Sequence, residues 1–171
     1  MADKAAKAAS KDSTLPECYS SISKTHLKFI LRTRTLQHWQ QLWDSTKNGQ
    51  HLKNYIPDIQ TYFNDRNITT DFHTTQLLTG HGSVNAYFKR FNIKTSGVCE
   101  CDFKTEQTYR HLLYDCRLLT DQRRRLQQEI TKNKGIWPVD ESTMFFKHFK
   151  ALRTFAVEMF EVMEKWHTHY R

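Results

Sequence analysis

Apolar side chains recur three and four positions apart along most of this chain, which is the spacing of one face of an α-helix. The longest such stripe lies near the C-terminus and consists of Phe145, Phe149, Leu152, Ala156, Met159, Met163 and Trp166. This stripe predicts a single helix over about residues 143–167. Strict alternation of apolar and polar residues, which would indicate a half-buried strand, is sustained nowhere. The pattern therefore predicts a mainly α fold.

Helical spacing and end signals predict further helices upstream of this stripe. The predicted helices cover residues 1–12, residues 23–47, a short stretch opening at Pro57, a stretch capped by Thr70 or Asp71 that runs through Leu77 and Leu78, a stretch capped by Ser83, and residues 120–134. Breaks are expected at Gly49, at residues 80–82 and at Gly135. Because the chain has only five glycines and three prolines, few other interruptions are expected.

The C-terminal stripe has two possible uses. It can be the core face of a helix that packs on its own domain. It can also be a face for self-association or for docking a protein partner, because heptad-like apolar spacing suits both roles. The residues proposed for such an interaction face are Phe145, Phe149, Leu152, Met159, Met163 and Trp166.

Three of the four cysteines lie close to a histidine, as Cys99, Cys101, His111 and Cys116. Three thiolates and one imidazole are a ligand set of closed tetrahedral zinc sites, which leave no position open for catalysis. Disulfides and buried free thiols are the alternatives, but residues 1–15 lack the apolar run of a secretory signal, so an oxidising compartment that would favour disulfides is not indicated. The cluster therefore predicts one structural Zn²⁺, and Cys18 is interpreted as a packing or surface thiol.

The charge balance adds a candidate partner. Lys and Arg number 26 against 18 Asp and Glu, for a formal net charge of +8, which favours a polyanion. Phe103 and Tyr109 can stack on unpaired bases while cations meet phosphates, although both rings can equally pack around a metal loop. The candidate nucleic-acid-binding residues are Lys89, Arg90, Lys94, Phe103, Lys104, Arg110, Arg117, Arg123 and Arg124. No apolar stretch approaches the ~20 residues of a membrane span.

Three blocks resemble the C-terminal end of non-LTR (LINE-type) retrotransposon polyproteins that carry an RNase H domain. HWQQLWDSTKNGQHLKNYIPD, residues 38–58, is similar to their Trp-rich segment, and LLTGHGSVNAYFKRF, residues 77–91, to their Leu-Thr-Gly-His-Gly motif. CECDFKTEQTYRHLLYDC, residues 99–116, is similar to their terminal zinc knuckle, although Asp102 and Phe103 stand where the family often has glycine. The resemblance implies handling of the element's RNA or target DNA, with one bound zinc.

The resemblance and the helical pattern together predict an organisation, although the C-terminal aromatic helix from Phe145 matches no motif of the family. Residues 1–22 form an N-terminal arm similar to the last RNase H helix plus a linker, in which Asp3 matches a catalytic carboxylate that cannot act alone. Residues 23–95 form a helical block, 96–118 a zinc knuckle and 119–171 a C-terminal helical pair. The chain is expected to be a fragment of such a polyprotein or a host-domesticated derivative.

The functional expectation is a binding module rather than an enzyme, because the sequence shows no Gly-rich phosphate loop, nucleophile elbow or paired carboxylates. Single-stranded RNA or DNA is the expected partner. The alternative is a protein-interaction or dimerisation adaptor in which the zinc is purely structural. An intracellular location is expected, with the nucleus favoured over the cytoplasm.

Overall fold

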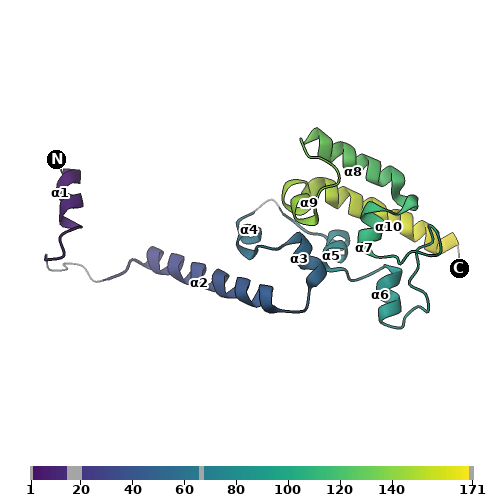
Figure 1. Ribbon diagram of the computed structural model, residues 1–171, viewed down its shortest axis with the longest axis horizontal. Coiled ribbons are helices and arrows are strands. Elements are labelled where there is room, and N and C mark those ends of the chain that lie inside the picture. Colours follow the sequence, from purple (N-terminus) through teal and green to yellow (C-terminus); the bar gives the residue numbers. More distant parts are fainter. Residues whose placement is uncertain (1, 15–20, 66–67, 170–171) are drawn as a thin grey trace. The chain divides into compact units, whose positions relative to one another are not determined.

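A computed structural model of the protein describes residues 2–14, 21–65 and 68–169, with side chains up to Trp166 (Figure 1). Within these ranges the chain forms helices and no strand, apart from one isolated bridge between Val98 and Glu106. The elements are α1 (Ala2–Ala9), α2 (Lys24–Ser45), α3 (Gln50–Tyr55), α4 (Ile59–Asn64), α5 (Phe72–Thr79), α6 (Asn85–Arg90), α7 (Tyr109–Tyr114), the 3₁₀ turn η1 (Arg117–Leu119), α8 (Thr120–Lys132), α9 (Glu141–Lys147) and α10 (Phe149–His169). The mainly α prediction is confirmed. Cys18 lies outside the described residues.

The chain divides into two units, residues 1–39 and 40–171. The first holds α1 and most of α2, and none of its described side chains is buried. Asp3 forms an exposed ion pair with Lys7, 2.9 Å apart and one helical turn away. Among the described helices of both units, none combines the length and apolar content that a bilayer crossing requires.

The core of residues 40–171 is built around α10. Figure 1 shows α8 running alongside α10, which also contacts α5, α9 and η1, while α3 packs on α5 and α9. Leu152, Phe155, Ala156 and Met159 of α10 are at most 1% exposed. These are stripe residues or their neighbours, so the periodic signal in the sequence marks a face that the fold buries.

The predicted single C-terminal helix is wrong in one respect, because His148 divides it into α9 and α10. The His148 backbone leaves the helical region, with φ −127° and ψ 26°. The stripe continues across the break because Phe145 of α9 and Leu152 of α10 enter the same core. Apolar spacing alone does not register a change of direction at one residue.

Several helix ends differ from their predicted positions. Gly49 does not stop α2 but lies at the start of α3, a helix that was not predicted, with φ 68°. Val84, rather than Ser83, is the N-cap of α6. At the end of α8 the left-handed residue is Lys134, with φ 62°. Gly135 follows it, and a Cβ there would lie 2.6 Å from Ile130 Cγ2, so close packing explains this glycine.

The Trp-rich segment joins the end of α2 to the helices that follow. Trp43 Nε1 donates a hydrogen bond to the Ile56 carbonyl at 2.9 Å, and Gln40 Nε2 donates to the Pro57 carbonyl at 2.9 Å. Gln40 Oε1 in turn accepts from the Ile59 amide at 2.8 Å. These bonds fix the approach to α4, which begins at Ile59 with Asp58 as its N-cap, so Pro57 lies just before the helix and not in its first turn as predicted.

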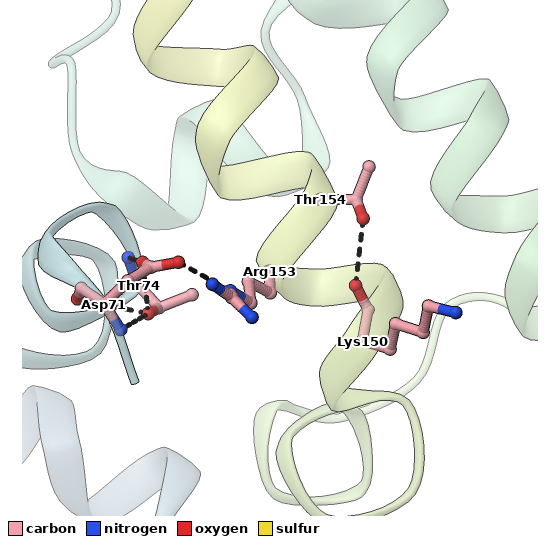
Figure 2. A network of polar contacts seen from close by, with 5 residues as sticks. All are labelled: Asp71, Thr74, Lys150, Arg153 and Thr154. Atoms are coloured by element: carbon pink, nitrogen blue, oxygen red, sulfur yellow. Dashed lines mark hydrogen bonds and ion pairs between the residues drawn. The ribbon is translucent and has the colours of Figure 1, made fainter. Parts of the chain in front are cut away.

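Asp71, one of the two residues predicted to cap α5, is its N-cap and also ties that helix to α10 (Figure 2). Its Oδ1 accepts hydrogen bonds from the Thr74 amide at 2.9 Å and the Thr74 hydroxyl at 2.7 Å, and its Oδ2 accepts from Arg153 Nε at 2.6 Å. Partial burial acts to raise the pKa of Asp71, but the bonds from Thr74 and the Arg153 guanidinium outweigh it and hold this pKa below its usual range. One carboxylate thus serves two helices.

Replacing Asp71 with Asn tests this tie. Asn caps helices as well as Asp but has no charge for Arg153, so Asp71→Asn should lower the free energy of unfolding by about 1 kcal/mol near pH 6. A lowered native pKa stabilises the fold above the unfolded value of about 3.9, and this contribution is lost as pH falls through the native pKa. The wild-type advantage should therefore shrink below about pH 4, measured by urea unfolding.

Asp58→Asn is the matched control, because Asp58 caps α4 through the Thr61 amide and no ion pair of Asp58 is present among the described contacts. Asp58→Asn should leave the free energy of unfolding almost unchanged both near pH 6 and below about pH 4. Equal losses for the two variants, or a pH-independent loss for Asp71→Asn, would show that the Arg153 pair contributes nothing measurable.

Candidate metal centre

The knuckle, residues 96–118, is a short loop followed by one helix. The Cys99 amide donates to the Thr105 carbonyl at 2.7 Å and the Phe103 amide donates to the Cys99 carbonyl at 2.9 Å, which closes the loop. The Thr108 hydroxyl caps α7 by accepting from the His111 amide at 3.1 Å. These local bonds bring the paired cysteines of the loop toward the histidine of α7.

Cys99, Cys101, His111 and Cys116 converge as the sequence predicts. One ligand atom from each lies within 4.8 Å of the others, so the four can hold one metal ion. Cys99 Sγ is 3.7 Å from Cys116 Sγ, and Cys101 Sγ is 3.4 Å from His111 Nε2. The three cysteines are free thiols, and only Cys101 is partly accessible to solvent. The disulfide alternative is therefore absent from this cluster.

The thiols influence one another strongly. The hydrogen bond with Cys116 and burial both raise the pKa of Cys99, whereas the same hydrogen bond lowers the pKa of Cys116. Burial, together with Cys99, raises the pKa of Cys101. Three neighbouring thiols thus do not all ionise readily, because their thiolates would repel one another. A divalent cation bound among them would offset this repulsion.

The knuckle packs directly on the main core. Cys99, Cys116 and Leu119 line one small cavity together with Met163 and Trp166 near the end of α10. Tyr109 is 3% exposed, and its hydroxyl donates to the His81 carbonyl at 3.1 Å. Tyr109 therefore packs inside the protein, and the stacking role considered for it is wrong.

Two predicted binding residues support the backbone of the cluster. Arg123 donates to the carbonyls of Leu113 at 2.9 Å and Cys116 at 2.6 Å, which occupies its guanidinium at the end of α7. Arg117 Nη2 donates to the Cys101 carbonyl at 2.9 Å, while its side chain remains exposed. Arg123 thus holds the C-terminal end of α7, the helix that carries His111. Its position in a run of three arginines did not reveal this role.

The other candidate cations lie on the surface with different partners. Arg110 pairs with Glu141, and Arg124 pairs with Asp121 at 3.1 Å. Lys94 follows α6, and its Nζ lies 2.8 Å from Asn85 Oδ1. At the end of α6, the Arg90 guanidinium lies 5.5 Å from the Phe91 ring centre. Lys89 and Lys104 are exposed.

Phe103 occupies an unusual conformation at the tip of the loop. Its φ is 54°, in the left-handed region that bulky residues disfavour by about 1–2 kcal/mol, and its side chain is 72% exposed. Asp102 makes the turn possible, because its Oδ1 accepts from the amides of Lys104 and Thr105. The Asp102 side chain thus closes the turn that places Phe103 at the tip of the loop.

Three polar residues of the centre were not foreseen: Asn85, Glu100 and Gln107, which form a hydrogen-bonded network behind Cys99. No periodic or spacing signal marks them. The proposed interaction face of the C-terminal stripe is largely internal, since Phe145, Leu152, Met159 and Met163 are buried and Phe149 and Trp166 are half-buried.

Comparisons with known proteins agree with the resemblance. No family model and no solved structure matches the chain. It is 27% identical over 139 residues to the Pol polyprotein of type-1 retrotransposable element R1 from Bradysia coprophila, covering 81% of this chain and 14% of the relative. It is 29% identical over 137 residues to the R1 Pol polyprotein of Popillia japonica, and this match covers 78% of this chain and 51% of the relative.

A third relative is a 115 kDa protein in the R1DM element of Drosophila melanogaster, 32% identical over 101 residues that cover 58% of this chain and 9% of the relative. The chain thus spans about half or less of the length of each of these relatives. Over most of its own length, its homologues are Pol polyproteins of R1 non-LTR retrotransposons.

Proposed function

We propose that this chain is a zinc-knuckle module that binds single-stranded nucleic acid, RNA or DNA, and acts by binding rather than by catalysis. The observation that carries the proposal is the loop tip, where the exposed Phe103 stands beside Lys104 in the same loop that carries Cys99 and Cys101 of a cluster able to hold one metal ion. The names of the homologues, Pol polyproteins of retrotransposable elements, support nucleic acid as the class of partner.

Zinc fits the cluster on chemistry and on distance. Bonds of about 2.3 Å to sulfur and about 2.0 Å to nitrogen at tetrahedral angles place two sulfurs about 3.8 Å apart and sulfur and nitrogen about 3.5 Å apart. One sulfur pair, Cys99 and Cys116, is 3.7 Å apart and one sulfur–nitrogen pair, Cys101 Sγ and His111 Nε2, is 3.4 Å apart, while all four ligand atoms lie within 4.8 Å of one another. Cys99, Cys101, His111 and Cys116 would fill all four positions. The zinc would then be structural, because no position remains for water or substrate.

The loop tip suits an unpaired base. Stacking on an aromatic ring contributes about 1–3 kcal/mol per base, and a base in a duplex does not offer its face. The backbone strain at Phe103 belongs to a residue whose ring contributes no core packing, which is the pattern of strain kept for function. Lys104 lies next to this ring in sequence, and its exposed ammonium is available for the adjoining phosphate.

The remaining phosphate contacts would come from cations that flank the loop. In addition to Lys104 of the loop itself, the exposed residues proposed for this role are Lys89, Arg90, Lys94, Arg110, Arg117 and Arg124. Arg123 would contribute indirectly through the carbonyls that it holds. An intracellular location, with the nucleus favoured, accompanies this function. The adaptor alternative gains no support from the described residues, because the stripe on which it rests is mostly buried in the chain's own core.

Removing a ligand should remove both the metal and the fold around it. Cys101→Ser and His111→Ala are expected to lose the single bound zinc, as counted by native mass spectrometry. Structural zinc supplies on the order of 10 kcal/mol of folding free energy, so both variants should also lose cooperative thermal unfolding. Cys18→Ser is the control and should retain one zinc. A zinc-free variant with wild-type stability would refute the site.

Replacing Phe103 should separate binding from stability. In Phe103→Gly the left-handed φ is unstrained, so the free energy of unfolding should stay within about 1 kcal/mol of wild type. Single-strand affinity should fall by about 1–3 kcal/mol because stacking is lost, whereas duplex affinity should barely change. Fluorescence anisotropy with labelled strands and a matched hairpin measures both.

Phe72→Ala is the matched control, because Phe72 of α5 is also 72% exposed but lies away from the knuckle in sequence. It should leave both affinities unchanged. Lys104→Gln should lower the affinity for the single strand and for the duplex by the same factor. It should also reduce the slope of log affinity against log salt concentration by about 1, because one phosphate contact is lost. Full single-strand affinity in Phe103→Gly would remove the stacking role from the proposal.

A further inference from the structure

Gln107 lies behind Cys99 with every polar group engaged. It is 2% exposed. Its Nε2 donates to Cys99 Sγ at 3.7 Å and to Glu100 Oε2 at 2.7 Å, and its Oε1 accepts from the Asn85 amide at 2.9 Å. The orientation of the carboxamide is thereby fixed, because the Asn85 N–H requires an acceptor and the Glu100 carboxylate requires a donor.

Further bonds hold the side chains around this carboxamide. Asn85 Nδ2 donates to Glu100 Oε1 at 2.9 Å and to the Val98 carbonyl at 2.9 Å, while its Oδ1 accepts from Lys94 Nζ at 2.8 Å. The Gln107 main chain is also bonded, with its amide donating to the Gly97 carbonyl at 2.8 Å. The network thus joins the first residue of α6 to the cysteine loop and aims one N–H at one sulfur.

We propose that Gln107 is a positioning residue of the metal centre, which stabilises the metal-bound thiolate of Cys99 through its N–H···S hydrogen bond. The inference rests on the proposed zinc site. Cys99 is fully buried, so its sulfur has no water to share its negative charge, and an N–H donor supplies that compensation. Such outer contacts orient ligands and typically change metal affinity 10–100-fold.

Gln107→Glu keeps the shape of the side chain and replaces the N–H donor with a carboxylate beside Glu100 and the thiolate. Zinc transfer to a chromogenic chelator should become at least ~10-fold faster. In the Co²⁺-substituted protein the sulfur-to-cobalt charge-transfer band should shift to longer wavelength, because an unbonded thiolate gives up an electron more easily. Gln128→Glu, on the exposed face of α8, controls for the added charge.

A swap variant separates the sulfur contact from mere support of the fold. Glu100→Gln combined with Gln107→Glu restores a donor–acceptor pair between positions 100 and 107 and leaves an acceptor for the Asn85 amide, but offers no N–H to Cys99. Our proposal requires the swap to keep the fast zinc release and the shifted cobalt band. Recovery of the wild-type rate and band in the swap would overturn it, since the role would then be support alone.

The outcomes distinguish this inference from the proposed function. A wild-type protein that binds no zinc overturns the zinc site and the inference together. A wild-type protein with one zinc, whose release and cobalt band are unchanged in Gln107→Glu, overturns the inference alone. If Gln107→Glu does not fold, Gln107→Met removes the donor without adding charge, and the same two readouts decide.

Discussion

The convergence of three sulfurs and one imidazole within 4.8 Å is the constraint on which the knuckle depends. The loop that supplies Cys99 and Cys101 is held internally by a few backbone and Asp102 hydrogen bonds, which is little for a segment this short. A metal ion held by this cluster would add a tie that local bonds do not provide, because its ligands join the loop to α7 and to the residue before η1. Two of the four candidate ligands, Cys99 and Cys116, also line a cavity with Met163 and Trp166 near the end of α10.

The metal centre contacts two parts of the protein, the main core and α6. On the core side, Leu119, Met163 and Trp166 cover the buried sulfurs. On the α6 side, the network of Gln107, Asn85 and Glu100 reaches the exposed Lys94. The loop that carries Phe103 is therefore held both by the core and by the α6 network. Because the Phe103 ring is already ordered, it loses little conformational entropy when it stacks.

Local signals in the sequence predicted most of the longer helices and the convergence of the four candidate metal ligands. The ligand set follows from residue type and spacing, and the cap at Asp71 follows from its position before an apolar run. The break at His148 was missed because Phe145 and Leu152 keep helical spacing across it. Gln107 and Arg123 were missed in their present roles, since a buried polar contact depends on which distant backbone or sulfur atoms the fold brings near.

The most direct test of the account is a binding isotherm of the zinc-loaded protein for a labelled single strand and for a matched hairpin, recorded across a salt series before and after chelation. The account predicts tighter binding to the single strand, a log–log decrease of affinity with salt from released counterions, and loss of the single-strand preference when zinc is removed. No measurable affinity for either form in the zinc-loaded protein, or a preference unchanged by chelation, would contradict it.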